Sequence, residues 1–252
     1  MDRGAAVLKV DDGAFLDGLG CYTTARISSG VASWCGRHIE RLTRDALALH
    51  LGAVDPAQVA RAFGELGEAA FSHGEGIIRL QASRSGGRLQ LVGVPRWLGP
   101  EPDSWRAATS PLAHPGPAAW GNVKLSGNPA LAVIRRWTAQ QDVEEALIYD
   151  ADGYLIEGTR SNLFVVTRDG TLGVPDLDRG GVRGIARDVV MEALPDARVR
   201  NLSAREIGDC RELIALNAVR GARPVIELDG KPVADGRPGP WAARLDAILA
   251  KG

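Results

Sequence analysis

The sequence predicts a mixed α/β protein built from two α+β lobes. Three observations lead to this prediction: a length of 252 residues, hydrophobic patterns that alternate between strand and helix periods, and an irregular stretch rich in proline and tryptophan between residues 94 and 120. The length exceeds one typical domain and falls short of two large ones. We therefore expect an N-terminal α+β domain over 1–98 and a C-terminal α/β domain over 99–252, with a small-molecule site in the cleft between them.

The first lobe reads as two hairpins and two helices. A Ser-Ser-Gly turn and an Arg-Ser-Gly-Gly turn each separate two β-rich runs. Apolar residues at steps of three and four predict the helices, and the second helix begins with the capping pair Asp55-Pro56. The expected elements are strands at 21–27, 30–34, 76–83 and 88–94, and helices at 36–49 and 55–74.

The second lobe mixes strands and helices after the irregular connector. An Asp-Gly turn separates two of its strands, and Ser203 with Glu206 forms a capping-box pattern for a short helix. Between 94 and 120 the sequence predicts no regular element. The remaining elements are expected at 128–141, 185–194 and 239–250 as helices, and at 145–150, 154–159, 162–166, 212–219 and 223–230 as strands.

Charge and cysteine content exclude several classes of protein. Thirty basic and 31 acidic side chains give a net charge of −1, which argues against nucleic acid and anionic membranes as partners. Three widely spaced cysteines without a CxxC pair predict neither a disulfide framework nor a metal site. Charges interrupt the apolar runs of the N-terminal segment MDRGAAVLKVDDG, and no stretch approaches the roughly 20 apolar residues of a membrane span. We therefore expect a cytoplasmic protein that is neither exported nor embedded in a membrane.

Lys124 is the first candidate for chemistry. It follows the irregular connector and precedes Leu-Ser-Gly-Asn-Pro, at the junction of a loop and a helix. A lysine held among apolar neighbours can lose its proton near neutral pH and attack carbonyl groups as an amine. The alternative is an ordinary solvated surface lysine.

Glu157 is the second candidate because it interrupts a strand of residues that favour burial. An isolated buried carboxylate is costly, so Glu157 needs a cation or a strong hydrogen-bond donor. That partner is either a ligand or Arg160, unless the side chain faces solvent.

Two further features suit a phosphate group but have ordinary explanations. The run DRGGVRGIARDVV places glycines before a helix, where backbone N–H groups can receive a phosphate, although its spacing matches no nucleotide-binding motif. Arg41 lies on the polar side of a helix, either as a phosphate clamp or as a solvated arginine. The neighbouring His38 belongs to no recognisable nucleophile motif.

In their order along the chain, these segments resemble the fold-type IV pyridoxal-phosphate (PLP) enzymes. This D-amino-acid aminotransferase-like group also includes branched-chain aminotransferases and 4-amino-4-deoxychorismate lyase. The resemblance extends over about residues 10 to 230. The segments that carry it are DGLGCYTTARISSG, RHIERL, Lys124, EALIYDADGYLIEGTRSNLFVV, GVRGIARD and NAVRGARPV.

The resemblance implies pyridoxal 5′-phosphate as the cofactor and assigns a role to each matching residue. Lys124 matches the lysine that forms the Schiff base and then moves the substrate proton. Glu157 matches the acid that pairs with the pyridine nitrogen, which keeps the ring able to accept electrons. The residues that match phosphate ligands are Arg41, Ile185, Ala186, Asn217 and Ala218.

Within the group, the run CYTTAR looks most like the lyase, because many transaminases carry glutamate where Thr23 stands. This implies conversion of 4-amino-4-deoxychorismate to 4-aminobenzoate and pyruvate, a step in folate precursor synthesis. Thr24, Arg26 and Arg88 are candidates for binding a substrate carboxylate.

The first alternative function is an aminotransferase for a branched-chain or D-amino acid or an amine, and the second is a non-catalytic relative that binds a small ligand. Family analogy also implies a homodimer.

Overall fold

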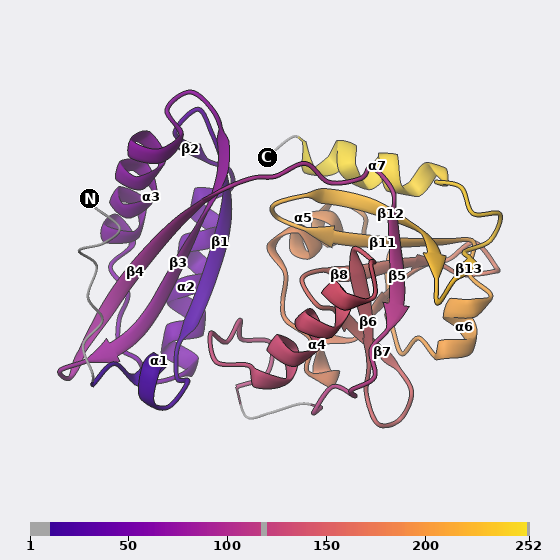
Figure 1. The fold of residues 1–252 in the computed structure, drawn as a ribbon, viewed down its shortest axis with the longest axis horizontal. Helices are drawn as coiled ribbons and strands as arrows, with labels where there is room; N and C mark the ends of the chain where they lie inside the picture. The colour runs from indigo at the N-terminus through magenta and orange to yellow at the C-terminus, as the bar shows by residue number, and fades with distance from the viewer. Residues whose placement is uncertain (1–10, 117–119, 251–252) are drawn as a thin grey trace. The chain divides into compact units, whose positions relative to one another are not determined.

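The computed structural model describes residues 11–116 and 120–250 and separates into two compact units. Unit 1 comprises residues 1–98 together with 123–128, and unit 2 comprises 99–122 and 129–252. Each unit has a sheet of its own with helices packed on it (Figure 1). The mixed α/β class expected from the sequence is therefore confirmed.

Unit 1 is built on an antiparallel sheet with the strand order β2-β1-β3-β4. Both expected hairpins are present, and both expected helices follow the predicted periodicity. Asp55 caps the second long helix by accepting the Ala57 N–H, with Pro56 at its first position, as the sequence indicated. The elements are α1 (Gly13–Leu16), β1 (Cys21–Ser28), β2 (Val31–Ala32), α2 (Cys35–Ala48), α3 (Pro56–Phe71), β3 (Glu75–Ser85) and β4 (Arg88–Trp97).

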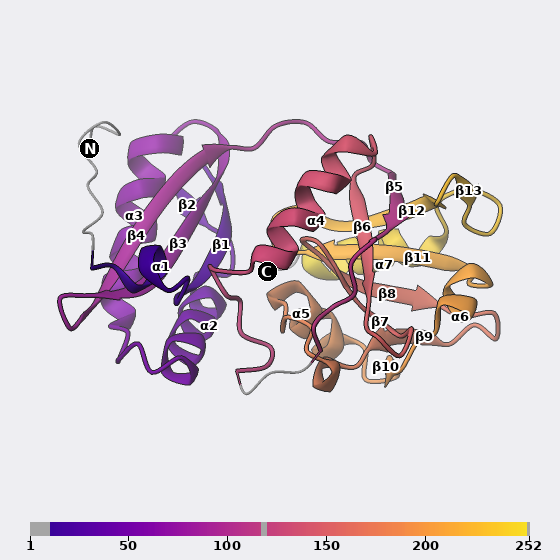
Figure 2. The same ribbon diagram turned by 60° about the horizontal axis from the view of Figure 1, so that its bottom comes forward.

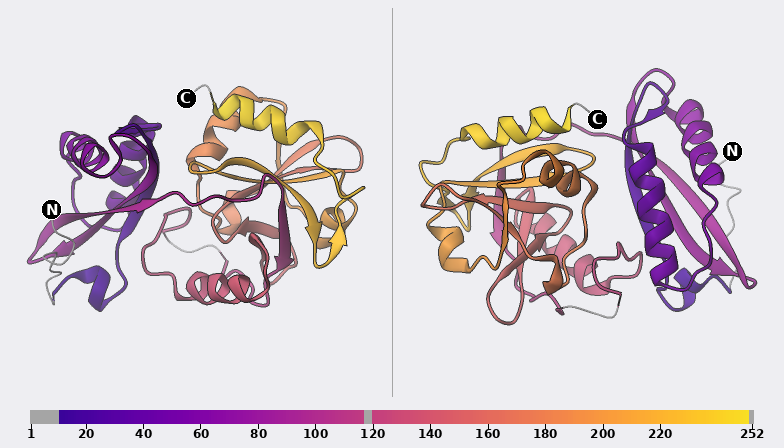
Figure 3. Two further views of the ribbon diagram at one scale, coloured as in Figure 1. Left: turned by 45° about the horizontal axis from the view of Figure 1, so that its top comes forward. Right: turned by 180° about the vertical axis from the view of Figure 1, so that it is seen from behind.

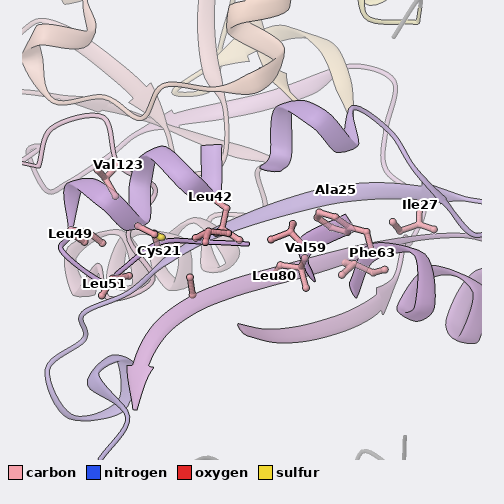
Figure 4. Packing of buried hydrophobic residues seen from close by; sticks show 14 of the residues in the cluster. Cys21, Ala25, Ile27, Leu42, Leu49, Leu51, Val59, Phe63, Leu80 and Val123 are labelled. Atoms are coloured by element: carbon pink, nitrogen blue, oxygen red, sulfur yellow. The ribbon is translucent and has the colours of Figure 1, made fainter. Parts of the chain in front are cut away.

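The two faces of this sheet have different compositions because side chains alternate along each strand. On one face, Cys21, Ala25 and Ile27 of β1 pack against apolar residues of α2 and α3 (Figure 4). In that buried cluster, Leu42 comes from α2 and Phe63 comes from α3. Figure 3 shows these helices and the sheet from two further sides. The opposite face carries Tyr22 and Thr24 of β1 and their partners Gln81 and Arg79 of β3.

Unit 2 contains a larger mixed sheet with the order β10-β9-β8-β11-β12-β5-β6-β7, with β13 paired to β12. The sheet curls so that β7 approaches β8 again. Figure 2 shows α4 beside β6, and Figure 1 shows α7 along β12. The elements are β5 (Trp105–Thr109), α4 (Pro129–Gln140), β6 (Glu145–Tyr149), β7 (Leu155–Gly158), β8 (Asn162–Val166), β9 (Leu172–Pro175), the 3-10 helix η2 (Leu177–Arg179), α5 (Ile185–Ala193), β10 (Arg198–Arg200), α6 (Ala204–Gly208), β11 (Glu212–Asn217), β12 (Gly221–Leu228), β13 (Lys231–Pro232) and α7 (Pro240–Leu249).

The expectation of an irregular connector over 94–120 is wrong in part, because β5 lies within it. β5 runs parallel to β12 and β6, and Trp105 at its start is fully buried. Both pairings join residues far apart in the sequence, so no local turn signal marks this strand. The short strands β9, β10 and β13 were not predicted either, whereas the capping box of Ser203 and Glu206 is present as expected.

The segment Val123–Asn128 does not follow the domain boundary expected at residue 98. It belongs to unit 1, whereas a boundary at residue 98 places it, with Lys124, in the C-terminal domain. Val123 joins the buried cluster of unit 1 near Leu42 and Cys21 (Figure 4). In residues 11–116 and 120–250, no helix has both the length and the hydropathy needed to cross a membrane.

Candidate active site

Lys124 is held on the edge of the unit 1 sheet by both of its peptide groups. Its carbonyl accepts the Tyr22 N–H at 3.0 Å, and its own N–H donates to Oδ2 of Asp45 at 3.0 Å. The side chain is half-buried, and its Nζ lies 5.0 Å from the centre of the Tyr22 ring. The interpretation of Lys124 as a fully solvated surface lysine is therefore wrong.

A second cation, Arg79 of β3, also lies over the Tyr22 ring. The Arg79 guanidinium carbon lies 3.6 Å from the centre of the Tyr22 ring, and Nη2 donates to Oε1 of Gln81 at 3.0 Å. Thr24 lies opposite Arg79 in the β1–β3 register. We call the surface made by Tyr22, Thr24, Arg79 and Gln81 the polar face of unit 1. It lies on the side of the sheet away from α2 and α3, and Lys124 adjoins it.

The three residues proposed to bind a substrate carboxylate are placed differently. Thr24 lies on the polar face and is half-buried. Arg26 lies two residues further along β1 and forms an exposed ion pair with Glu75 at 2.6 Å, so its charge is already matched. Arg88 is exposed at the start of β4, opposite Ser85, which is four residues or roughly 13 Å along β3 from Gln81.

Arg41 and His38 are buried on α2 rather than solvated. Arg41 is 6% exposed, and His38 is fully buried. Burial, followed by the nearby Arg41 charge, lowers the pKa of His38 to about 3, so the imidazole is neutral at physiological pH. Thr23 shares a hydrogen bond with Nδ1 of His38. Thr23 therefore faces α2, on the opposite side of the sheet from the polar face.

Glu157 is a buried carboxylate of unit 2. It is 6% exposed, and its Oε2 accepts the Val182 N–H at 2.9 Å. Arg160 is engaged elsewhere, because it donates to Glu101 and to the carbonyl of Glu144. The solvent-facing interpretation of Glu157 is thus wrong, and a backbone N–H orients its side chain.

The same loop leads into the start of α5, where Ile185 and Ala186 lie. Gly184 is the N-cap, so no side chain caps the first turn, and its N–H groups point away from the helix without intrahelical partners. Asn162 fixes the loop by donating to the Val182 carbonyl at 2.9 Å. A Cβ added at Gly184 would lie 1.9 Å from Oδ1 of Asn162, so this close approach requires glycine.

Asn217 ends β11, and Ala218 begins the turn that leads to β12. Oδ1 of Asn217 accepts the N–H groups of Val219 at 3.0 Å and Arg220 at 2.8 Å. Its Nδ2 lies 3.4 Å from Oγ of Ser161. The Asn217 side chain therefore shapes the turn, and Ala218 sits within it as a small residue.

Residues 20–228 match the family model of amino-transferase class IV, which is most of the chain. The chain belongs to this family. It is an enzyme of the PLP-dependent fold-type IV group, and its cofactor is pyridoxal 5′-phosphate.

Some similar proteins are named as aminotransferases, and one is named as a lyase. A protein of Methanocaldococcus jannaschii named "Putative branched-chain-amino-acid aminotransferase" is 25% identical, over 97% of this chain and 91% of its own length. A structure named as a hypothetical aminotransferase from Mycobacterium tuberculosis in a PLP-bound form is 22% identical, with a TM-score of 0.85 over 99% of this chain and 94% of that one. A structure from Legionella pneumophila, named "Putative 4-amino-4-deoxychorismate lyase", is 20% identical, with a TM-score of 0.86 over 99% and 97%.

The residues of this class IV enzyme suit the groups of the cofactor. PLP carries an aldehyde, a pyridine nitrogen and a phosphate, and the chain supplies a partly buried amine, an oriented buried carboxylate and an uncapped helix start. In the described parts of the chain, no group of three or more His, Cys, Asp or Glu side chains could hold a metal ion.

Tyr22, Arg79 and Asp45 were not predicted as site residues from the sequence. The alternation in β3 contained a signal for Arg79, because Arg79 and Gln81 interrupt the apolar run GIIRLQA at alternate positions. Asp45 contacts a residue 79 positions away, so no local pattern indicates its role.

Proposed function

We propose that this class IV enzyme is a lyase that converts 4-amino-4-deoxychorismate to 4-aminobenzoate and pyruvate. The observation that carries the proposal is the polar face beside Lys124. It presents a hydroxyl, a phenol and the Arg79 guanidinium, which suit a substrate with two carboxylates better than a branched aliphatic side chain. The run CYTTAR adds support through its resemblance to the lyase.

In the proposed reaction, the amine of Lys124 would hold the cofactor, and the same amine in its free form would take the proton from the substrate carbon that bears the amino group. When bound, PLP supplies an electron sink for the charge that remains on that carbon. Glu157, oriented by the Val182 N–H, keeps a proton at the pyridine nitrogen. Loss of that proton would be coupled to cleavage of the ring C–O bond, whose electron pair would leave with the enolpyruvyl oxygen. The released enol would take up a proton and become pyruvate, so no second substrate is needed to balance the atoms.

The phosphate is assigned to backbone donors and one cation. Ile185 and Ala186 supply N–H groups at the start of α5, where the helix dipole favours an anion. Asn217 and Ala218 supply the second turn, and Arg41 supplies the positive charge. Thr24 and Arg79 are assigned to a substrate carboxylate.

The second candidate function is amino transfer. It is favoured by the Methanocaldococcus jannaschii relative, whose alignment spans nearly all of both chains and whose name is that of a branched-chain aminotransferase. An aminotransferase needs the same lysine, acid and phosphate ligands, so these residues do not distinguish the two activities.

Product analysis separates the candidates. The holoenzyme is incubated with 4-amino-4-deoxychorismate alone, and pyruvate is followed with lactate dehydrogenase; parallel reactions contain amino acids paired with 2-oxo acids. Pyruvate and 4-aminobenzoate formed in equal amounts without an acceptor support the lyase. Amino transfer without pyruvate release from 4-amino-4-deoxychorismate rejects it in favour of the second candidate.

A third arm tests the non-catalytic alternative. Bound PLP should give a visible absorption band, and borohydride reduction should attach the cofactor covalently to the peptide that contains Lys124. A preparation that stays colourless with added PLP, or that carries the label on another lysine, contradicts the proposed role of Lys124.

A further inference from the structure

The segment that contains Lys124 pairs with β1 along the part of its edge that β2 does not cover. β2 pairs only with Ile27 and Ser28, at one end of β1. At the other end, Cys21 and Leu125 form an antiparallel bridge, with hydrogen bonds from Tyr22 N to the Lys124 carbonyl and from Ser126 N to the Gly20 carbonyl at 2.9 Å. Val123 anchors the segment in the buried cluster of unit 1.

The ladder is not continued at Lys124. In an antiparallel hydrogen-bonded pair, the two facing residues exchange both of their N–H and carbonyl bonds. Lys124 gives its carbonyl to Tyr22, but its N–H turns to Oδ2 of Asp45 instead. A side chain of α2 therefore replaces a strand partner at the lysine itself.

Asp45 is suited to this contact because its charge is matched and its oxygens are occupied. The side chain is fully buried, and Oδ1 accepts Nε of Arg44 at 3.0 Å and Nη2 at 2.8 Å. A buried carboxylate is retained at low cost only when it is paired and hydrogen-bonded in this way. Hydrogen bonds to a charged acceptor are also shorter and stronger than neutral ones.

We propose that Asp45 is a positioning residue for the amine of Lys124. It holds the Lys124 N–H while β1 holds the carbonyl, so both peptide groups of the lysine are fixed and only its side-chain torsions remain to be ordered. The proposal rests on the proposed role of Lys124. Its consequence is catalytic, because a displacement of about 1 Å at a reacting group can cost on the order of 10²-fold in rate.

The first test is amide hydrogen exchange in the apo protein, which needs no catalysis. In the wild type, the Lys124 N–H should exchange as slowly as amides inside β1. In Asp45→Ala, the peptide covering residues 122–128 should exchange about 10-fold faster or more, as expected when one charged hydrogen bond is lost. Peptides from β3 and from unit 2 should be unchanged.

Two further variants separate positioning from general stability. Asp45→Asn keeps an oxygen acceptor of the same shape and should restore most of the protection of residues 122–128. Arg44→Ala removes the partner of Oδ1 and should lower the melting temperature, yet leave the Lys124 N–H protected. In steady-state kinetics, Asp45→Ala should lower kcat on the order of 10²-fold with KM within about twofold, and Asp45→Asn should recover most of kcat.

Several outcomes overturn the proposal. Rapid exchange of the Lys124 N–H in the wild type does so even when the alanine variant fails to fold. Equal acceleration of all unit 1 peptides in Asp45→Ala, or the same exchange pattern in Arg44→Ala, indicates a structural role only. If borohydride labels another lysine while exchange still depends on Asp45, the role of Lys124 fails and the backbone contact stands.

Discussion

The two units hold their candidate functional groups by different means. In unit 1, side chains do the positioning, since Asp45 fixes Lys124 and the Tyr22 ring carries Arg79. In unit 2, backbone groups dominate, because a backbone N–H orients Glu157 and the start of α5 offers N–H groups. Substitutions in unit 1 should therefore act through the loss of a particular side chain. In unit 2, apart from Glu157, substitutions should act mainly where they shift the backbone donors.

The difference explains why the backbone donors are harder to identify from the sequence than Lys124 and Glu157. A backbone donor can be supplied by almost any residue, so Ile185 and Ala186 are recognisable only through the family resemblance. A lysine or a buried acid is chemically distinctive, and both Lys124 and Glu157 stand out in the sequence itself.

The largest effect is expected for Lys124→Ala. The change removes the amine but leaves the backbone bonds to Asp45 and Tyr22, so unit 1 should fold normally. Loss of the group that transfers the proton should lower kcat about 10³-fold or more. Pyruvate release measures the rate, and circular dichroism checks the fold. Retention of more than a tenth of wild-type activity would contradict the role.

Glu157→Gln should have the next largest effect. The amide oxygen can still accept the Val182 N–H, but the negative charge that stabilises a protonated pyridine nitrogen is gone. We expect kcat to fall roughly 10²-fold with PLP still bound. Glu227→Gln on β12 of the same unit is the matched control. Equal rates in the two variants would remove Glu157 from the mechanism.

Arg79→Ala should raise KM more than it lowers kcat. A hydrogen bond to a charged group is worth about 1.5–3 kcal/mol, which corresponds to roughly 10- to 100-fold in KM for a carboxylate substrate. Arg88→Ala, at the exposed hairpin end, should leave KM within about twofold. The opposite ranking of the two variants would show that the substrate carboxylate lies at the other end of the sheet.

Gly184→Ala tests the backbone-based half of the comparison. The added Cβ would overlap Oδ1 of Asn162, so the start of α5 must shift. We expect weaker PLP binding by about tenfold and a loss of stability of about 1–3 kcal/mol. Gly208→Ala on α6 has open space around the new Cβ and should be tolerated. PLP titration by absorbance distinguishes the two variants.

The smallest effect concerns the pH dependence of stability. The pKa of His38 is about 3 in the fold against 6.5 for the free side chain, because of burial and then the Arg41 charge. Between these pH values His38 is protonated in the unfolded chain but neutral in the folded protein. The free energy of unfolding is therefore highest, as far as His38 is concerned, above pH 6.5, and it falls progressively as the pH is lowered towards 3.

Chemical denaturation of the apo protein at pH 7.5 and 5.5 measures this contribution. The wild type should lose up to about 1.4 kcal/mol per pH unit below 6.5 that His38→Gln does not lose. His73→Gln on the exposed surface is the control for removing an imidazole. A His38→Gln slope equal to that of the wild type would show that His38 titrates normally.

Local signals in the chain were enough to predict most helices and strands and the chemically distinctive residues. Hydrophobic periodicity and capping residues predicted α2, α3, both hairpins of unit 1 and most elements of unit 2, because these signals act between residues close in the chain. Lys124 and Glu157 were identifiable because an amine or a carboxylate in an apolar setting requires an explanation.

The pairing of strands and the hydrogen-bond partners of Lys124 and Glu157, in contrast, follow from the folded arrangement. β5 became a strand through parallel partners distant in sequence, Lys124 joined unit 1 through Asp45 and β1, and Glu157 received its partner from a loop 25 residues away. These contacts depend on chain segments brought together by packing, and no periodicity within one segment encodes them. Physically, the sequence fixes local conformational preference and burial tendency, whereas hydrogen-bond partners are chosen only once the core has formed.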